Sequence, residues 1–586
     1  HAIVSFGGAG GQHICGVAKK LGVSRLLSPR DSGLLSAYGL SMSRIERVIE
    51  KPIYRPLSQI EFIDFEDELI QQGYKLLSGF SGQADVEIKT AFVRMKGQES
   101  GLEVEYKEGI EIRELYENKF EDIFGYLPAR NKVEIYGLRI LLAFPSPDFG
   151  QEKFTSKDIR SARFREKKVI CRDDLEHGEF VFGPCLVVDD FGALWIERGW
   201  KGIKGDLGSI MVEEISTGSD SDNELTVERE LFTSRFFCLV EEMGVQLKRT
   251  AISVNVRERL DFSCALLDSE GYLVANAPHI PVHLGALGLC VRESIKLFPH
   301  LQPGDIIITN HPAYGGSHLP DITVIAPIFS DTNQIIGFLA NRAHHAEIGG
   351  ILPGSMPAGS KNLLEEGVVI SPRYLFRAGH SCMNEIAVLL SDSEFPSRQI
   401  KDNLADLSAQ VASLRQGLKE MKILESEYTC DTLIVQMKNL HFDASTICEK
   451  FLCEWGNGFF STTQCLDDGE ELKLDLQIKD GHATFDFSGT ASFRKDNLNA
   501  TVAITQSAVC YCLRVLINKE IPLNEGLLKP VSIIIPQGSI LSPTFSRIPC
   551  QCPGVAGGNV EVSQKLVDLI LGAFDRVACS QGTMNN

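Results

Sequence analysis

The sequence predicts a multidomain fold of mixed α/β and α+β class. The chain has 586 residues, which is enough for about three or four domains. Hydrophobic residues make up 44% of it and charged residues 23%, the proportions of an ordinary soluble globular protein. Short apolar segments with the spacing of strands alternate with amphipathic helical segments, and this alternation predicts sheets covered by helices.

Charge and cysteine content exclude several classes of protein. The net charge of −19 argues against a protein that binds the nucleic-acid backbone, which needs a basic face. No run of about 18 apolar residues occurs, so no membrane-spanning helix is expected. The sixteen cysteines are scattered and form no C-x-x-C pair, which is typical of reduced thiols rather than of a disulfide framework or a zinc ribbon. We therefore predict a cytoplasmic protein that binds neither nucleic acid nor membrane.

Residues 1–45 begin with an apolar strand, Ala2–Phe6, which runs into the glycine turn GGAGGQH and an amphipathic helix through Leu21. A glycine turn between a strand and a helix directs backbone N–H groups toward an anion. The turn matches neither the P-loop pattern nor the dinucleotide-binding pattern. A turn that needs glycine only for tight packing has the same signature, so both interpretations stay open.

Two further segments precede the largest one. Residues 46–165 combine short strands with one amphipathic helix near Ile112–Phe124 and an apolar strand after it. Residues 166–215 contain short apolar strands separated by glycines, which predicts a small β-rich module. The polar, acidic stretch 216–224 predicts a linker.

Residues 225–586 are expected to form one large mixed domain. It opens with a helix capped by Thr226, followed by a β-hairpin that turns at Ser269–Gly271. A buried strand at 304–310 precedes two paired strands, DITVIAPIF and QIIGFLANRAHH. Further patterns predict helices within 398–440, in AVCYCLRVLI and in VSQKLVDLILGAF, and a second hairpin in DLQIKDGHATFDF.

A candidate metal site lies where these strands end, within Asn310–Gly350. Seven of the thirteen histidines fall within His279–His345. The segment NHPAYGGSHLPD places His318 three residues before Asp321, beside two glycines that let a ligand approach the backbone closely. Imidazole and carboxylate groups are the usual ligands of zinc and of manganese-type ions.

A second polar cluster follows one strand later, where NRAHHAEIGG contains His344, His345 and Glu347. Asp261 stands at the start of the first hairpin strand, within reach of the same site, and the two histidines of PHIPVHLGA are expected to line the same cleft. A connecting loop rich in glycine, proline and histidine would explain either cluster alone. Two such clusters so close together make a metal site about as well supported as a connecting loop.

Motifs in both halves of the chain resemble the hydantoinase A and hydantoinase B families. FGGAGGQH and DSGLLSAYGL resemble the closing part of the ATP-binding, actin-like domain of hydantoinase A, and VRMKGQESGLEVEY and FGYLPARNKVEIYGLRI resemble its C-terminal region. Segments of the second half resemble the hydantoinase B family. They are ERLDFSCALLD, NHPAYGGSHLPDITV, RAHHAEIGGILPGSMP, DNLADLSAQVA, FDFSGTA, IPLNEGLLKPV and GGNVEVSQ. The order A then B on one chain is most similar to members that act on 5-oxo-L-proline.

The resemblance implies a domain division. Residues 1–45 would close an actin-like ATPase domain, 46–165 would be the C-terminal α/β region of hydantoinase A, and 225–586 would be a hydantoinase B-type domain truncated at its C-terminus. The family's N-terminal phosphate-binding motif does not occur in this sequence. We therefore expect an internal fragment of a longer polypeptide that cannot turn over ATP by itself.

The resemblance also implies an activity, the ATP-dependent hydrolytic opening of the lactam 5-oxo-L-proline to L-glutamate. ADP and phosphate would be released, and this fragment would hold the hydrolytic half. The implied cofactors are Mg-ATP in the full-length parent and a divalent ion of zinc or manganese type in the hydantoinase B-type domain. Apart from the small-molecule substrate 5-oxoproline, the expected partner is the chain itself, as a homodimer or higher homo-oligomer.

Roles for individual residues follow from the same resemblance. The nucleotide would lie near the glycine turn, the metal near the two histidine clusters, and the general base beside the metal. The corresponding residues are Gly7, Gly8 and Gly10 for the nucleotide; Asp261, His318, Asp321 and His344, with His345 as the alternative to His344, for the metal; and His311, Glu347 and Glu365 for catalysis.

Two alternatives stay open. The first is a related ATP-dependent hydantoinase or an acetone-carboxylase-type enzyme, because nothing in the residues fixes which ring is bound. The second is a non-catalytic assembly module in which the histidine clusters are structural. Glycine-flanked polar clusters at strand ends are poorly suited to building a core, and this favours an enzyme.

Overall fold

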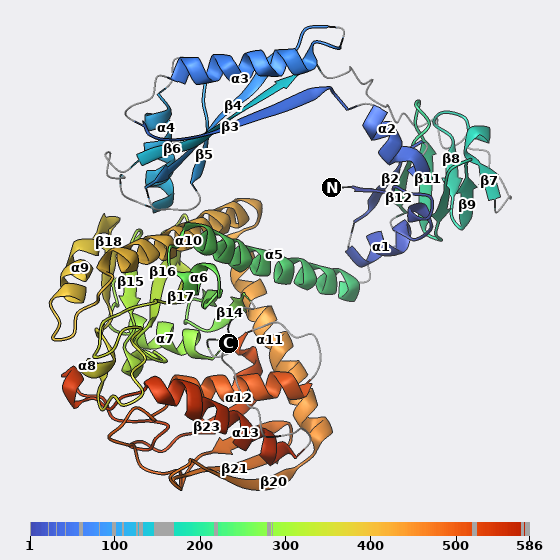
Figure 1. Cartoon of the computed structure of the whole chain (residues 1–586). Helices are drawn as coiled ribbons and strands as arrows, with labels where there is room; N and C mark the ends of the chain where they lie inside the picture. The colour runs from blue at the N-terminus through green and yellow to red at the C-terminus, as the bar shows by residue number, and fades with distance from the viewer. Residues whose placement is uncertain are drawn as a thin grey trace.

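The structure, a computed structural model, describes residues 2–21, 23–30, 32–41, 43–57, 62–80, 82–96, 101–107, 111–124, 127, 133–145, 169–215, 221–277, 280, 283, 285–517, 524–575 and 579. Figure 1 shows two smaller α/β parts above and beside a large one. The predicted mixed α/β multidomain class is confirmed. His279 and the linker residues 216–220 lie outside the described residues.

The first part is a five-stranded sheet in the order β1-β2-β12-β11-β8. Its strands come from both ends of a long stretch of chain: β1 (Ile3–Val4), β2 (Arg25–Ser28), β8 (Phe180–Phe182), β11 (Trp200–Lys204) and β12 (Ile210–Glu214). The segments 1–45 and 166–215, which the sequence treats separately, therefore share one sheet. The physical reason is that β2 would otherwise expose a free edge, which β12 covers by antiparallel pairing.

A second, three-stranded sheet and two helices complete this part. The sheet has the order β10-β9-β7, and its hydrophobic core is continuous with that of the first sheet. These elements are α1 (Ile14–Leu21), α2 (Leu35–Ser41), β7 (Val169–Cys171), β9 (Cys185–Val188) and β10 (Ala193–Ile196).

The second part is a four-stranded antiparallel sheet in the order β3-β6-β4-β5. Helix α4 (Ile112–Phe124) has the predicted bounds and buries Ile112, Tyr116, Phe120 and Phe124, which recur every four residues along one face. The other elements are β3 (Glu46–Pro56), α3 (Phe62–Leu77), β4 (Asp85–Met95), β5 (Leu102–Glu105) and β6 (Val133–Ala143).

The large part is built on a seven-stranded antiparallel sheet in the order β14-β13-β17-β16-β15-β18-β19. The hairpin at Ser269–Gly271 and the paired strands after 320 are present as predicted. The strands are β13 (Phe262–Asp268), β14 (Leu273–Asn276), β15 (Ile306–Thr309), β16 (Asp321–Phe329), β17 (Ile335–His344), β18 (Arg373–Arg377) and β19 (His380–Ser381).

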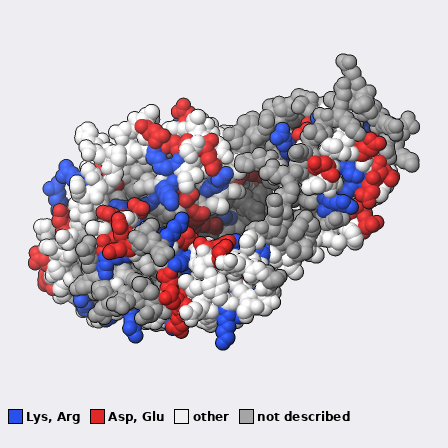
Figure 2. Space-filling view, turned by 90° about the horizontal axis from the view of Figure 1, so that it is seen from above, with Lys and Arg blue, Asp and Glu red and all other residues white. Residues whose placement is uncertain are grey.

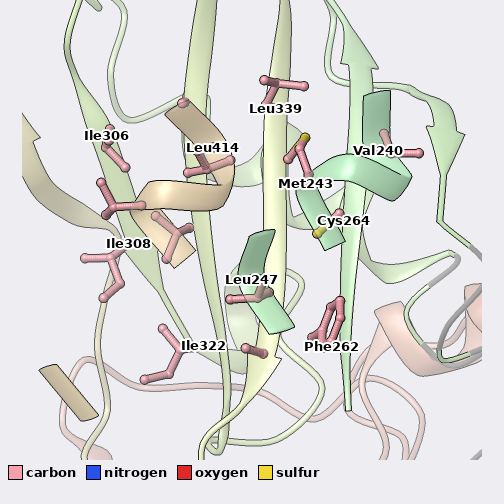
Figure 3. Close-up of a cluster of buried hydrophobic side chains, with 14 of the residues drawn as sticks. Val240, Met243, Leu247, Phe262, Cys264, Ile306, Ile308, Ile322, Leu339 and Leu414 are labelled. Carbon is pink, nitrogen blue, oxygen red and sulfur yellow. The ribbon is translucent and has the colours of Figure 1, made fainter. Parts of the chain in front are cut away.

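Helices cover both faces of this sheet. On one face lie α5 (Ser221–Thr250) and α10 (Ile400–Glu427), and Figure 3 shows Met243, Leu414 and Leu339 from the two helices and the sheet meeting in one core. On the other face lie α7 (Ala286–Ile295) and α12 (Val502–Ile517). The sheet is therefore buried on both sides, and any polar residue on it must find a partner there.

Helix α5 begins at Ser221, five residues before the predicted cap Thr226. The residues Ser221–Glu224, which the sequence assigns to the linker, are helical. The division of the chain at this linker stays a prediction.

A second sheet, in the order β20-β21-β22-β23, completes the large part. The predicted helical stretch 398–440 divides after α10, because the side chain of Thr429 accepts a hydrogen bond from the N–H of Thr432 and starts a new helix, α11. The remaining elements are α6 (Val254–Arg257), α8 (Leu363–Glu366), α9 (Met383–Ser391), α11 (Cys430–Trp455), β20 (Gly458–Cys465), β21 (Glu471–Lys479), β22 (His482–Asp486), β23 (Val531–Ile534) and α13 (Ser563–Phe574).

The described surface mixes both signs of charge, and Figure 2 shows basic and acidic side chains interspersed on the face seen from above. Among the described helices none is long and apolar enough to cross a membrane.

Candidate metal centre

The pairing of two strands brings Asp321 and His344 together. Asp321 opens β16 and stands directly opposite His344, the last residue of the antiparallel strand β17. Opposite residues of an antiparallel pair project from the same face, so the two side chains lie side by side. The His344 Nδ1 atom is 3.3 Å from Asp321 Oδ1.

His345, the alternative ligand, is directed to the other side of the sheet. Successive residues of a strand alternate between faces, and His345 faces helix α10. Its Nε2 atom lies 3.1 Å from Gln410 Oε1, and its Nδ1 atom lies 3.2 Å from Asn403 Nδ2. Both ring nitrogens are thus used by the helix layer, and the structure does not bring His345 into the cluster.

His318 completes the cluster from the loop before β16. Its Nδ1 atom is 3.1 Å from Asp321 Oδ2. One ligand atom each from His318, Asp321 and His344 can be chosen so that all lie within 4.8 Å of one another. Asp261, just before β13, lies at the rim, with its Oδ2 atom 3.7 Å from His344 Nδ1.

Two buried side chains fix the loop that carries His318. The Asn310 side chain donates to the carbonyls of Leu319 (2.8 Å) and Val368 (3.0 Å). Arg342, which is fully buried, donates through Nη2 to the carbonyl of Gly315 (2.9 Å) and through Nε to Thr323 Oγ1 (2.8 Å). The loop is therefore held at both ends by contacts that do not use the cluster itself.

The electrostatics of the cluster favour an ionised carboxylate. Burial raises the pKa of the Asp321 carboxyl, but the positive charges of His318 and His283 outweigh burial and hold the pKa well below its ordinary value. Burial lowers the pKa of His344, whereas the adjacent carboxylate of Asp321, together with the charge of Asp261, raises it above its ordinary value overall.

Two buried atoms of the cluster lack a hydrogen bond among the described residues. These are His318 Nδ1 and Asp321 Oδ1. Unsatisfied buried polar atoms are costly, and a ring nitrogen and a carboxylate oxygen without hydrogen bonds in one cluster are groups that a bound cation would use. The donor chemistry and the two free atoms therefore fit a divalent metal ion of zinc or manganese type.

Two further residues contact Asp321, a third contacts one of these two, and the sequence did not assign two of the three. His283, from the segment expected to line the cleft, places Nε2 3.3 Å from Asp321 Oδ2. Ser317 donates its hydroxyl to the same oxygen, and Ser263 lies 3.0 Å from His283 Nδ1. The signal for Ser317 was its position next to His318, and for Ser263 its position two residues after Asp261.

The candidate general bases are held in other contacts, outside the cluster. His311 accepts the N–H of Ala313 through Nδ1, and burial lowers its pKa to about 4. Its proton in the neutral form is therefore on Nε2, which leaves no lone pair to accept another. Glu347 pairs with Arg398 (2.8 Å) and accepts two backbone N–H groups, and Glu365 accepts the N–H of Lys361 (2.8 Å).

Glu366, next to the predicted Glu365, is the buried acid of this region. Its carboxylate accepts the N–H groups of Val555 (2.9 Å) and Ala556 (3.1 Å) and the hydroxyl of Ser360 (3.0 Å). Burial raises the pKa of Glu366 to about 7, although these hydrogen bonds oppose the rise. The residues just before the glycine pair that precedes α13 thus bind a carboxylate of the chain itself.

The glycines of the turn near the N-terminus differ in how much room a side chain would have. A side chain at Gly11 would place its Cβ 2.4 Å from the carbonyl oxygen of Ala193, so close packing explains this glycine. At Gly7 a Cβ would meet nothing within 4 Å, and at Gly8 and Gly10 only ordinary contacts at 3.4 and 3.5 Å. Packing therefore does not require these three, although the φ of +81° at Gly7 favours glycine there, and their place beside a nucleotide stays a prediction.

The chain matches known families along most of its length. Residues 226–586 match Hydantoinase B/oxoprolinase, and residues 1–48 match Hydantoinase/oxoprolinase. It is 37% identical to the 5-oxoprolinase of Saccharomyces cerevisiae and 36% identical to 5-oxoprolinase 1 of Arabidopsis thaliana, with all of this chain covered but only 49% and 50% of those proteins. The chain thus spans about half the length of the curated relatives it matches.

A solved structure shares the fold. The ATP-dependent caprolactamase from Pseudomonas jessenii superimposes with a TM-score of 0.54 over 60% of each chain, at 24% identity. At that level of identity the likeness concerns architecture alone. The match to residues 226–586 spans more than half of the chain and includes the histidine cluster. The chain therefore belongs to the Hydantoinase B/oxoprolinase family.

Proposed function

We propose that this chain provides the hydrolytic half of an ATP-dependent 5-oxoprolinase, which opens 5-oxo-L-proline to L-glutamate. The observation that carries the proposal is the buried cluster of His318, Asp321 and His344, with two atoms free for a cation. The relatives named 5-oxoprolinase, which match the whole chain at 36–37% identity, indicate the substrate.

The metal would be held by His318, Asp321 and His344, with Asp261 as a further donor. A set of two imidazoles and one or two carboxylates suits both zinc and manganese. When bound, such an ion supplies a Lewis acid and lowers the pKa of a water molecule.

The chemistry fits a divided reaction. A lactam carbonyl is a poor electrophile, and transfer of the γ-phosphoryl group of Mg-ATP to the amide oxygen turns that oxygen into a leaving group. Water then adds to the ring carbon, the C–N bond of the ring breaks as the nitrogen takes up protons, and an acyl phosphate results. A second water molecule adds to the acyl carbon and displaces phosphate. The products are L-glutamate, ADP and phosphate.

The residues of this chain would assist the hydrolysis that follows phosphoryl transfer. Asp321 stays ionised because His318 and His283 depress its pKa. Burial of His283, His318 and Asp321, none more than 4% exposed, excludes bulk water from the donors. Asp261 is the most exposed group of the cluster, with 25% of its side chain accessible, so it marks the side from which a water molecule can reach the metal donors.

Metal analysis of the purified chain is the first test. We expect about one equivalent of divalent ion after reconstitution, and less than about a tenth in His318→Ala, because one of three ligands is lost. The same substitution at His345 should leave the metal content unchanged, since its ring faces helix α10. Equal metal loss in both variants would contradict the ligand assignment.

The substrate needs a protein that also contains the ATPase half. A chimera in which this chain replaces the matching half of the Saccharomyces cerevisiae relative should release ADP in a manner that depends on 5-oxoproline. Hydantoins, and ketones with bicarbonate, serve as competing substrates. Faster ADP release with one of these would reassign the substrate while leaving the metal centre intact.

We further propose Mg-ATP binding near Gly7, Gly8 and Gly10 in the complete enzyme, and a cytoplasmic homodimer or larger homo-oligomer. Light scattering of the purified protein tests the assembly, and a monomer at micromolar concentration would contradict it.

A further inference from the structure

The two carboxylate oxygens of Asp321 have unequal surroundings. Oδ2 accepts a hydrogen bond from the Ser317 hydroxyl and another from His283 Nε2 at 3.3 Å, and it also lies 3.1 Å from His318 Nδ1. Oδ1 accepts no hydrogen bond among the described residues, although it faces His344 Nδ1 at 3.3 Å. Two groups outside the cluster, Ser317 and His283, therefore contact Oδ2, whereas Oδ1 faces only a histidine of the cluster.

Both ring nitrogens of His283 have a partner. An ionised carboxylate only accepts, so the proton between His283 and Asp321 is on His283 Nε2. The other ring nitrogen, Nδ1, lies 3.0 Å from the Ser263 hydroxyl oxygen. Ser263, His283 and Asp321 thus form a chain of hydrogen bonds that ends at Oδ2, and each member is at most 1% exposed.

The three residues that position the Asp321 carboxylate come from three separate parts of the fold. Ser263 is on β13, His283 precedes helix α7, and Ser317 is in the loop that carries His318. Ser263 stands opposite Arg342 on β17, and Asp321 stands opposite His344 on the other edge of the same strand, so all lie on the face covered by α7 and α12. The direction of the Asp321 carboxylate is therefore set by packing between layers and not by its own strand alone.

We infer that Ser317 and His283, the latter contacted by Ser263, are positioning residues that hold Asp321 Oδ2 and so orient the carboxylate toward a divalent cation bound with His318 and His344. This inference rests on the proposed metal function. Residues that hydrogen-bond a ligating carboxylate fix its direction, and their loss typically weakens metal binding by about 10- to 100-fold.

The test measures Mn²⁺ affinity of the purified chain by the EPR signal of the free ion. Ser317→Ala removes a single oxygen atom, and His283→Ala removes the ring; each should weaken binding by about 10- to 100-fold. His283→Gln keeps an N–H donor for Asp321 and should restore most of the lost affinity. Ser263→Ala should have a smaller effect, because it acts only through His283.

A matched control separates positioning from a general loss of stability. His441 is a buried histidine (4% exposed) that hydrogen-bonds the carbonyl of Leu273 and lies beside Asp268, at the far end of β13. His441→Ala should lower the thermal stability as His283→Ala does but leave the Mn²⁺ affinity unchanged. Wild-type affinity in both Ser317→Ala and His283→Ala would overturn the inference while the metal site stands.

If no ion binds at all, crystal structures of the wild type and of Ser317→Ala can still test whether Ser317 positions the Asp321 carboxylate. That result would remove the proposed metal function, but the carboxylate of Asp321 should still rotate once its partner is deleted. An unchanged Asp321 side chain in Ser317→Ala would overturn the positioning role as well.

Discussion

His344 and His345 have the same chemistry, and only their direction from the sheet separates them. Choosing between them requires the register of β16 and β17. Counting back from the turn, where Phe329 pairs with Ile335, would place Asp321 opposite Ala343. An irregularity between Ile328 and Phe329 shifts the register by one residue, so Asp321 faces His344 instead. The sequence therefore predicts the ligand types but not which of the two histidines faces Asp321.

Glu366 supplies a prediction at the same scale. Its pKa rises from an ordinary value of 4.5 to about 7, chiefly because of burial. A raised folded-state pKa contributes stability that is complete below pH 4.5 and is lost as the pH rises through 7. At 1.36 kcal/mol per pKa unit, that loss amounts to at most about 3 kcal/mol.

Glu366→Gln removes this titration and keeps a side-chain oxygen for the N–H groups of Val555 and Ala556. Urea unfolding at pH 5 and pH 8 should therefore show a smaller loss of unfolding free energy in the variant than in the wild type. Glu365→Gln, one residue away and partly exposed, is the control and should follow the wild type. Parallel losses in all three proteins would contradict the raised pKa.

Local sequence patterns predicted the bounds of individual elements, but they did not predict which strands pair over long distances in the chain. The bounds of α4 and of β16 agree with the sequence because apolar spacing and turn residues act within a few positions. The pairing of β2 with β12 joins residues almost 200 positions apart, and no local signal specifies it. In the same way, the three residues of the cluster were predicted from their strand ends, whereas the contacts of Ser263 and Ser317 depend on how the layers pack.

The loop before β16 allows a test at the scale of elements. Gly315 has a φ of +80°, and a Cβ there would lie 2.5 Å from the backbone nitrogen of Cys290 at the edge of α7. Gly354 has a φ of +85° with nothing within 4 Å, so it shares the backbone strain but not the clash. Gly354→Ala should cost about 1–2 kcal/mol of unfolding free energy.

Gly315→Ala should cost at least about 1 kcal/mol more than that, since the loop or α7 must also move. Because Arg342 holds the same loop through the Gly315 carbonyl, the shift should reach His318 and weaken Mn²⁺ binding. Chemical denaturation and the EPR titration measure the two effects. Equal costs in the two variants would mean that the loop accommodates the added methyl group freely.

In the whole molecule, helix α10 connects two of the parts shown in Figure 1. One side of it packs on the seven-stranded sheet through Leu407, Val411 and Leu414. Another side meets the second part, where Ala412 (1% exposed) joins the core around α4, and the Arg415 side chain donates to the carbonyl of Glu121 (3.3 Å). Helix α10 thus hydrogen-bonds His345 through one side and packs against the second part of the molecule through another.

This arrangement predicts that the two contacts of α10 can be separated. Ala412→Arg introduces a long charged side chain where only a methyl group fits, so the second part should detach from the helix and the radius of gyration in X-ray scattering should increase. The sheet-facing residues are untouched, and the Mn²⁺ affinity should stay at the wild-type value. Ala412→Ser, which is small enough to keep the contact, should leave both quantities unchanged. If Ala412→Arg kept the wild-type scattering curve, the packing of α4 on α10 would not hold the two parts together; if it lost Mn²⁺ binding, the metal centre would depend on the neighbouring domain through this helix.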